Sequence, residues 1–277
     1  MPSTPETTDR ANVEYWNELC GTNLANHLGI KDASERSLKK FDDWFFSFYP
    51  YLFIHIPFDE LKGKDVLEVG LGYGTVAQRL AENGARYTGL DIASGPVEMA
   101  RHRLSQAGLP GEAQQGSILT APFSDDSFDA IVTIGCLHHT GDLAKAIDEC
   151  HRILRPGGKI ILMLYYAYSY RRWMQARKET LRYLLREQLG YSGVVQPRSE
   201  LEKWDYDHNT DGQAAPHTDF VSIRSLKKMC KNFSSFEYRV ENINIEPPFQ
   251  RWKSRRDLLK TLYPRMIGLD IYATAAK

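Results

Sequence analysis

The chain has 277 residues, of which 42% are hydrophobic and 25% charged, and its acidic and basic side chains are equal in number. This composition is typical of a soluble globular protein, and the length suits one α/β domain with an appended lid. No apolar run reaches the roughly 18 residues of a membrane span, and residues 1–16 lack the pattern of a signal peptide. The four cysteines are far apart, so we expect no disulfide framework, no metal site and a cytoplasmic location.

Residues 10–60 read as helices rich in aromatic side chains, and a regular alternation begins at Lys64. The expected strands are 65–70, 86–92, 111–118, 128–135 and 159–166, and the helices between them are 75–84, 96–108 and 142–154. Strands that alternate with helices predict a parallel sheet with both faces covered.

Residues 167–221 break this alternation with a helical stretch at 169–190 and a polar loop at 205–220. A helix at 222–233, capped by Ser222, and strands at 236–246 and 268–276 then follow. We therefore divide the chain into a helical cap (1–60), an α/β core (61–166), an inserted lid (167–221) and a completion of the core (222–277).

The stretch DVLEVGLGYG at 65–74 places three glycines at alternate positions directly after a strand. Glycine allows a sharp turn and a close approach of the backbone to a ligand at the carboxyl ends of the strands. The spacing fits neither a dinucleotide fingerprint nor a phosphate loop, because Thr75 stands at the third glycine position of the former. The pattern is instead E-x-G-x-G-x-G.

This pattern resembles the class I S-adenosylmethionine-dependent methyltransferases, and the resemblance covers residues 64–164. It implies a doubly wound, mostly parallel seven-stranded sheet, a Rossmann-like methyltransferase fold, with a helical N-terminal cap and an insertion after strand five. It also implies S-adenosylmethionine as cofactor, with Asp91 at the ribose. Ser117 departs from the family, in which Asp is common at that position. The residues that the resemblance places at the cofactor are Tyr15, Trp16, Glu68, Gly70, Gly72, Gly74, Asp91, Ile92, Ser117, Ile118 and Gly135.

The end of the fourth strand carries GCLHHT, which should face the methyl group. His138 and His139 could serve as a general base or orient the acceptor, or could be scaffold that packs near the cofactor. Cys136 lacks the preceding proline of the cytosine-5 methyltransferases, and the Asn/Asp-Pro-Pro-Tyr/Phe motif of adenine N-methyltransferases is also missing. Both absences argue against a nucleic-acid substrate.

The lid supplies the expected acceptor site. Tyr165 and Tyr166 leave strand five, Arg171 follows them, and His217 and Asp219 lie in a loop that should return over the sheet. His217 is a further catalytic candidate, although an Asx-type turn also explains this loop. Residues 165–277 carry an excess of seven basic residues, so we expect an acceptor with an acidic group. Residues 207–212 match half of a calcium loop, but Thr218 stands at its twelfth position, which favours a polar turn.

We therefore expect a methyltransferase that acts on a small molecule, with O-methylation of a metabolite or sugar first and N-methylation as the close alternative. An RNA methyltransferase and a cofactor-binding protein without catalysis are the other classes that remain. The sequence names neither the acceptor nor the oligomeric state.

Overall fold

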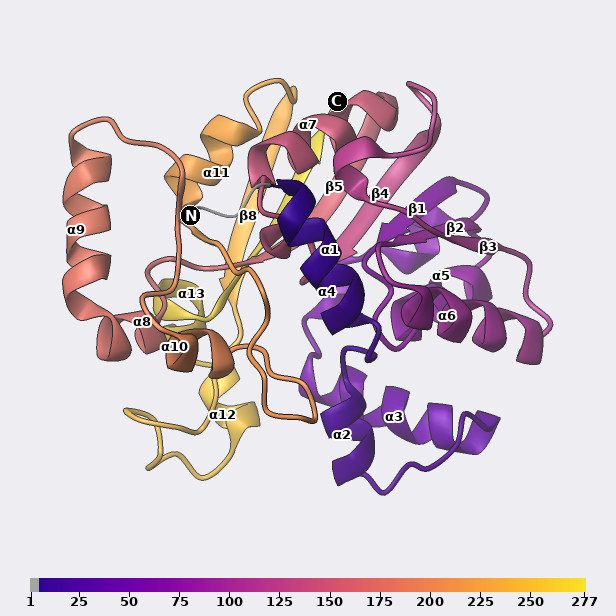
Figure 1. Ribbon diagram of the computed structural model, residues 1–277, viewed down its shortest axis with the longest axis horizontal. Helices are drawn as coiled ribbons and strands as arrows, with labels where there is room; N and C mark the ends of the chain where they lie inside the picture. Colours follow the sequence, from indigo (N-terminus) through magenta and orange to yellow (C-terminus); the bar gives the residue numbers. More distant parts are fainter. Residues whose placement is uncertain (1–4) are drawn as a thin grey trace.

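The computed structural model describes residues 5–277 and consists of a central sheet with helices on both faces (Figure 1). The sheet has seven strands in the order β3-β2-β1-β4-β5-β9-β8. The first five are parallel to their neighbours, whereas β9 runs antiparallel to both β5 and β8. The expected doubly wound, mostly parallel seven-stranded sheet is thus confirmed. Its strands are β1 (Asp65–Val69), β2 (Arg86–Asp91), β3 (Glu112–Gln115), β4 (Phe128–Ile134), β5 (Leu154–Tyr165), β8 (Ser235–Glu241) and β9 (Asp270–Ala276).

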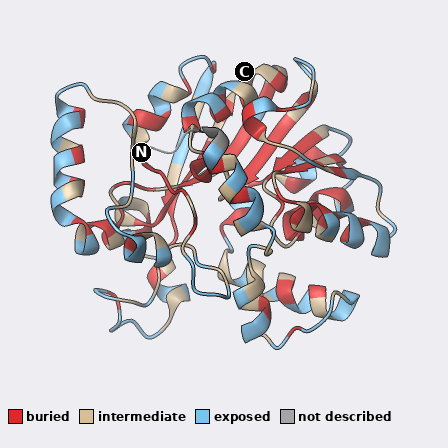
Figure 2. Cartoon of the chain, in the orientation of Figure 1, coloured by how far each residue is buried: buried red, intermediate tan, exposed pale blue. Residues whose placement is uncertain are grey.

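Each face of the sheet packs against its own set of helices, because neighbouring side chains on a strand point to opposite faces. On β1, Val66 joins one apolar cluster, and Leu67 and Val69 join the other. Figure 2 shows the central strands as the most buried part of the molecule, whereas the edge strand β8 is partly exposed. The first cluster includes residues of α4 (Leu52–His55), α5 (Thr75–Glu82) and α6 (Ser94–Gln106), and the second includes residues of α7 (Leu143–Ile153) and α11 (Ile223–Met229).

Several helices begin where the sequence provides a polar cap. The side chain of Ser222 accepts a hydrogen bond from the backbone N–H of Ser225, as the sequence predicted, and Asp142 caps α7 in the same way. The helix that was expected at 169–190 is two helices, α8 (Tyr170–Gln175) and α9 (Arg177–Gln188), because Ala176 leaves helical geometry between them. The last but one strand ends at Glu241 rather than at residue 246, since Asn242 adopts a positive φ of 66°.

The expected insertion after strand five contains α8, α9, α10 (Glu200–Trp204) and a small antiparallel pair of strands, β6 (Val194–Val195) and β7 (Phe220–Val221). Between β8 and β9 lie α12 (Arg255–Leu259) and α13 (Tyr263–Ile267). No helix among residues 5–277 is long and apolar enough to cross a membrane. The domain boundaries at residues 60, 166 and 221 stay predictions, and residues 1–4 of the cap lie outside the described chain.

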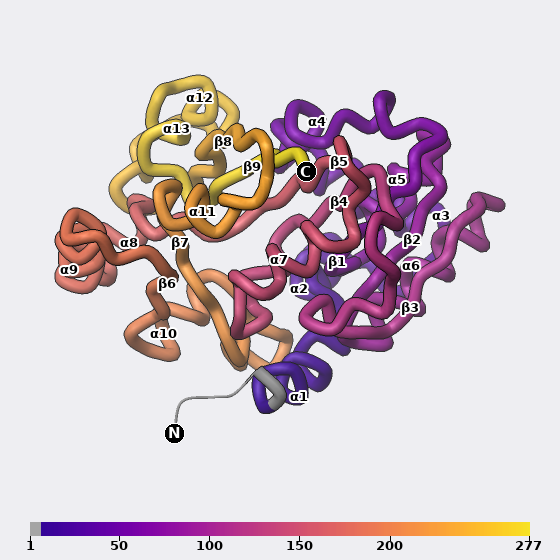
Figure 3. Tube along the Cα trace, turned by 90° about the horizontal axis from the view of Figure 1, so that it is seen from above, coloured from indigo at the N-terminus to yellow at the C-terminus, as the bar shows by residue number. Residues whose placement is uncertain are grey.

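The helices that precede the sheet are α1 (Pro5–Trp16), α2 (Thr22–His27), α3 (Glu35–Phe48) and α4, followed by a short 3₁₀ turn at Phe58–Leu61. In Figure 3, α1 lies beside the loop that follows α10. Among the described residues, three residue pairs join the two segments through side-chain hydrogen bonds: Tyr15 to Gln213 (3.3 Å), Asn23 to His208 (3.0 Å), and Glu18 to the hydroxyl (2.7 Å) and backbone N–H (2.9 Å) of Thr210. We call these segments, residues 15–23 and 207–213, the roof.

Candidate active site

The glycine loop begins at the carboxyl end of β1, and its shape depends on glycine at two positions in particular. Gly70 has a φ of 83°, and a Cβ there would collide with the side chain of Cys136, which follows β4. Gly74 has a φ of 72° and is the N-cap of α5, where a Cβ would press against Arg103. The loop therefore lies tightly against β4, and Gly74 serves packing rather than the cavity walls.

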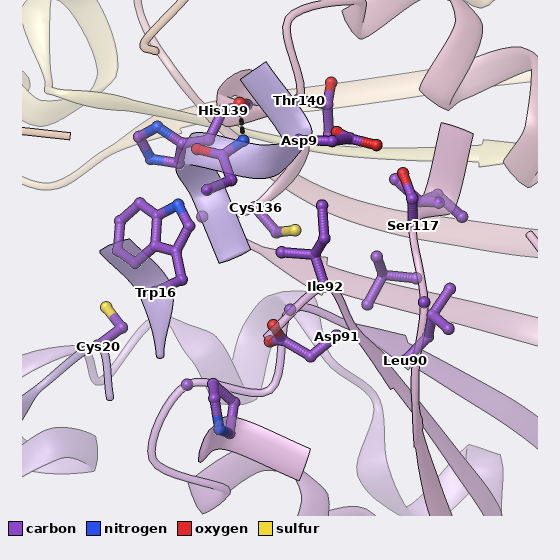
Figure 4. Close-up of a pocket in the computed structure, with 18 of the residues that line it drawn as sticks. Asp9, Trp16, Cys20, Leu90, Asp91, Ile92, Ser117, Cys136, His139 and Thr140 are labelled. Atoms are coloured by element: carbon purple, nitrogen blue, oxygen red, sulfur yellow. Dashed lines mark hydrogen bonds between the residues drawn. The ribbon is translucent and has the colours of Figure 1, made fainter. Parts of the chain in front are cut away.

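A cavity of about 110 Å³ opens over the ends of β1, β2 and β4. Figure 4 shows Asp91, Ile92 and Ser117 around it, with Trp16 and Cys136 close by. The structure therefore brings most of the expected cofactor residues together. Of these, the cavity is lined by Trp16, Gly70, Gly72, Asp91, Ile92, Ser117, Ile118 and Gly135.

Asp91 ends β2 at the centre of this wall. Its two carboxylate oxygens accept hydrogen bonds from the backbone N–H groups of Leu71 (2.8 Å) and Ala93 (2.9 Å). Burial raises the pKa of Asp91 to about 6, and the two backbone hydrogen bonds act in the opposite direction. One carboxylate thus orders the glycine loop and faces the cavity at the same time.

A second cavity, of about 400 Å³, lies on the other side of the glycine loop. The two cavities share five wall residues, which are Trp16, Cys20, Gly70, Gly72 and Ile134. Tyr15 and Glu68, both expected at the cofactor, line the second cavity only. Glu68 is 4% exposed and accepts a hydrogen bond from the Tyr87 hydroxyl at 2.7 Å. Burial raises the pKa of Glu68 to about 8.

His139 lies between the two cavities. It lines the first cavity, its Nε2 lies 3.5 Å from Oδ2 of Asp207, and Asp207 lines the second. Its Nδ1 lies 2.6 Å from the carbonyl oxygen of His217, so Nδ1 must carry the proton and donate it. Nε2 then keeps its lone pair, and it has no hydrogen-bond partner among the described residues. Asn12 of α1 donates to the His139 carbonyl at 2.8 Å (Figure 4).

The pKa of His139 is lowered by burial, while the negative charge of Asp207 acts in the opposite direction. His139 is therefore a neutral imidazole near pH 7, with a lone pair on Nε2. Asp207 also accepts a hydrogen bond from the Tyr165 hydroxyl at 2.8 Å. The group formed by His139, Asp207 and Tyr165 thus joins the ends of β4 and β5 to the roof.

The other two candidate histidines are not cavity residues. His138 is fully buried, its ring packs 4.1 Å from that of Tyr165, and burial lowers its pKa well below the usual value. His217 lies behind His139, with its Nε2 3.0 Å from Oδ1 of Asp219. Asp219 is 2% exposed, and its backbone N–H donates to the His138 carbonyl. His138, His217 and Asp219 therefore support His139 from the side away from the cavities.

Two expected acceptor residues lie elsewhere. Tyr166 belongs to the apolar core below the sheet face, and its backbone bridges to Val221. Arg171 donates to Glu246 through Nε (3.0 Å) and Nη2 (2.7 Å), so its charge is already balanced within the fold. Its neighbour Arg172 is fully buried and pairs with Glu202. The structure therefore contradicts the expectation that Arg171 binds an acidic group of the acceptor, because its guanidinium is already paired with Glu246.

Sequence reasoning missed several wall residues. Asp9, Asn12 and Cys20 of the cap line the first cavity, and Trp44, Phe45 and Tyr49 line the second. The sequence indicates helices rich in aromatic side chains over residues 10–60, but it does not place these side chains at a cavity. A usable signal was present, since α3 carries more apolar side chains than one core-facing stripe requires. Asp207 gave no signal, because it lies in a loop without periodicity.

The residues that form this site also carry the similarity to known proteins. Residues 67–162, which include the glycine loop, Asp91 and the His138–His139 pair, match the family described as a methyltransferase domain. The chain is thus similar to a methyltransferase domain over these residues, as its resemblance to the class I S-adenosylmethionine-dependent methyltransferases predicted. Its seven-stranded fold matches that of an S-adenosylmethionine-dependent methyltransferase from Mesorhizobium loti, with 16% identity, a TM-score of 0.53 and coverage of 83% of this chain and 97% of the other.

A sequence relative of the methyltransferase domain is the ubiquinone biosynthesis O-methyltransferase of Pseudomonas paraeruginosa, 33% identical over 105 residues. That match covers 37% of this chain and 44% of the relative, so the chain matches less than half the length of this relative. The [4+2]-cyclase SpnF also has this fold, at 15% identity and a TM-score of 0.55, over 98% of this chain and 96% of its own. The reaction must therefore be argued from the site rather than from the fold.

Proposed function

We propose that this protein binds S-adenosylmethionine and transfers its methyl group to a small-molecule acceptor. The observation that carries the proposal is the pair of cavities that meet at Gly70 and Gly72, with His139 and Asp207 at their junction. One cavity has the walls of a nucleoside site, and the other is a separate space with aromatic walls. Pockets of a few hundred Å³ are typical of small ligands, which favours a small acceptor over RNA.

The residues present fit the cofactor. Asp91 would hold the ribose hydroxyls, because each of its oxygens has a lone pair beyond the one that the backbone uses. Ile92, Pro96 and Ile118 offer apolar walls to the adenine. Glu68, Gly70 and Gly72 would hold the methionine end, and Tyr15 and Trp16 would close over it. When bound, the cofactor supplies an electrophilic methyl group, which the protein needs only to orient and desolvate.

His139 is the group best placed to remove a proton from the acceptor. A hydroxyl or an amine that gains a methyl group must also lose a proton, and Nε2 of His139 is the free base at the junction. Asp207 stabilises the imidazolium that forms, since its carboxylate lies 3.5 Å away. His217 fixes the tautomer through its backbone carbonyl rather than acting on the acceptor itself.

The methylated atom is a separate question. The sequence favoured oxygen, and a relative over the core is named an O-methyltransferase, which supports oxygen. N-methylation is the second candidate, and the acidic side chains that line the larger cavity support it. Four free cysteines support the cytoplasmic location that the sequence led us to expect.

The test combines binding with turnover. Calorimetry should detect binding of S-adenosylhomocysteine and no binding of NAD. Methyl-labelled S-adenosylmethionine should then label compounds in the small-molecule fraction of a cell extract, and RNA should stay unlabelled. Binding of NAD without binding of S-adenosylhomocysteine would contradict the cofactor assignment, whereas cofactor binding without any labelled product would leave a binding protein.

A further inference from the structure

The walls of the larger cavity combine carboxylates with aromatic rings. The acidic side chains are Glu18, Asp207 and Glu68, and Glu68 is protonated near pH 7 because burial raises its pKa to about 8. Among the described residues, neither cavity is lined by a lysine or an arginine. This composition contradicts the acidic acceptor that the charge of residues 165–277 led us to expect. The aromatic wall residues are Tyr15, Trp16, Phe41, Trp44, Phe45, Tyr49, Tyr73 and Tyr206.

The nearest arginines are held behind this wall by partners of their own. Arg171 lies 4.7 Å from the Tyr206 ring and pairs with Glu246. Arg103 lies 5.9 Å from the Tyr73 ring and pairs with Asp42. Arg255 lies 5.9 Å from the Tyr49 ring and donates to the Phe48 carbonyl and to the side chains of Asn242 and Asn244. None of these three arginines lines the cavity. Within the described chain, no arginine or lysine is found over the rings of Tyr15, Trp16 or Trp44, so their faces can accept a cation.

Asp207 is the wall carboxylate that is available to an acceptor, because one of its oxygens is not used by the fold. Its Oδ2 accepts a hydrogen bond from the Tyr165 hydroxyl, and no group within residues 5–277 donates a hydrogen bond to its Oδ1. Glu18, in contrast, accepts from both the backbone N–H and the hydroxyl of Thr210 and so belongs to the roof. A second observation points to a ligand here. Nε2 of His139, in a residue 4% exposed, has no hydrogen-bond partner in the part of the chain that the structure describes. It lies 3.5 Å from Oδ2 of Asp207, although both atoms are acceptors.

We propose that the acceptor is an organic amine that is cationic in solution, with its apolar body against the aromatic wall and its nitrogen beside Asp207 and His139. This inference rests on the proposed methyl transfer and names its substrate class. An N–H group placed between Nε2 of His139 and Oδ2 of Asp207 satisfies two acceptors that otherwise face each other. A carboxylate-bearing acceptor in the same place would add a like charge.

The charge balance of the reaction agrees with this assignment. The bound ammonium first gives one proton to Nε2 of His139, which frees the lone pair on nitrogen. That nitrogen forms the N–C bond, the C–S bond breaks with its electron pair left on sulfur, and the positive charge passes from sulfur to nitrogen. The methylated product keeps this charge, so the reaction releases one proton in total, and Nε2 of His139 is its acceptor. The carboxylate of Asp207 and the aromatic faces stabilise the positive charge on nitrogen after transfer.

The experiment measures binding of two matched series to the protein saturated with S-adenosylhomocysteine. The first series is phenethylamine, phenethyl alcohol and phenylacetate, and the second is tryptamine, tryptophol and indole-3-acetate. We expect each amine to bind at least about tenfold more tightly than the alcohol and the acid of its series. Asp207→Asn should remove about tenfold of the amine affinity and leave the alcohols unchanged. Asp211→Asn, the same change at an exposed position of the same loop, should alter neither.

Several results would overturn the inference. Acids or alcohols that bind as tightly as the amines, or no binding by either amine, would show that the cavity selects another class. If Asp207→Asn weakens S-adenosylhomocysteine and leaves the amine preference intact, Asp207 belongs to the cofactor site. Failure of S-adenosylhomocysteine itself to bind contradicts the proposed function instead, and the two series on the free protein then still decide the amine preference.

Discussion

Asp91 serves the glycine loop and the cavity with the same carboxylate. Asp91→Ala removes the carboxylate that would accept hydrogen bonds from the two ribose hydroxyls. We therefore expect S-adenosylhomocysteine to bind more weakly by about 2–4 kcal/mol. Calorimetry measures this change directly. Glu112→Ala is the matched control, because Glu112 is exposed on the neighbouring strand β3. An unchanged dissociation constant in the Asp91 variant would place the ribose elsewhere.

His139 can be tested with a substitution that keeps its structural contact. In His139→Asn, an amide nitrogen near the position of Nδ1 can still donate to the His217 carbonyl, whereas the base at Nε2 is lost. We expect kcat to fall by about 10²–10⁴-fold, the usual contribution of a general base. Initial rates with the amine that binds most tightly provide the measurement.

The pH dependence of kcat separates catalysis from structure in the same experiment. Burial lowers the pKa of His139 from 6.5, so its base form is already complete near pH 7 and is lost only as the pH falls below that value. The wild-type protein should therefore show an acid limb below pH 6.5, and His139→Asn should lack it. An acid limb that persists in the variant would assign the proton acceptor to another group.

At the residue scale, the sequence predicted those site residues that follow strands. Asp91, Ile92 and Gly70 stand at fixed distances from a regular apolar strand, and parallel strands bring their carboxyl ends to one edge. Asp207 could not be found in this way, because its position depends on how a polar loop folds back over the sheet. Arg171 was misjudged for a related reason, since its partner Glu246 lies 75 residues away.

At the scale of elements, helix α3 is fixed to the core by a buried ion pair. Arg103 of α6 has a fully buried side chain and donates to both carboxylate oxygens of Asp42, at 2.8 and 3.0 Å. Asp42→Ala would leave this guanidinium buried without its partner, so we expect the free energy of unfolding to fall by about 3 kcal/mol.

The neighbouring residue is the matched control for this prediction. Asp43 pairs with Lys39, but both side chains are more than half exposed, so Asp43→Ala should change the free energy of unfolding by about 0.5 kcal/mol or less. Urea unfolding followed by circular dichroism measures both variants. Equal effects would mean that α3 does not depend on Arg103.

The elements between residues 65 and 166 were predictable because a strand–helix alternation has two clear periodicities. The elements of the lid were harder to predict from the sequence. The break at Ala176, where φ is −127° and ψ is 42°, lies inside a sequence that reads as one helix and has no glycine or proline beside it to mark it. The two-residue strands β6 and β7 are too short to leave a pattern.

At the scale of the whole molecule, buried acids should make the ligand-free protein less stable at alkaline pH. Burial raises the pKa of Glu68 from 4.5 to about 8 and that of Asp270 from 3.8 to about 7, so the folded state holds protons that the unfolded state releases. Their contribution is complete below the unfolded pKa values and is lost as the pH rises through the folded ones. We therefore expect the melting temperature to fall between about pH 5 and about pH 9.

Glu68→Gln tests this linkage, because the amide keeps an acceptor for the Tyr87 hydroxyl and cannot ionise. The decrease in melting temperature over the same pH range should be smaller in the variant than in the wild type. A decrease of the same size would show that Glu68 does not hold its proton in the folded protein. Thermal unfolding without cofactor provides both curves.

The net charge of each half of the chain does not describe the charge of the cavity walls. The excess of basic residues after residue 165 includes Arg171 and Arg172, whose charges are balanced by Glu246 and Glu202 within the fold. Charge counted along a sequence includes every such internal pair, whereas a ligand meets only the side chains that line its cavity.

We expect the opening of the roof to limit the rate of turnover. Its links between residues 15–23 and residues 207–213 are exposed side-chain hydrogen bonds, each worth about 0.5–1.5 kcal/mol net, whereas the sheet beneath is closed by backbone ladders. The two segments can therefore separate many times without disturbing a strand. In the proposed function the demethylated cofactor would lie under these two segments, so its release would require them to separate. We expect the first turnover of each molecule to be faster than those that follow, and an initial burst of product in rapid-mixing experiments is the sign of it.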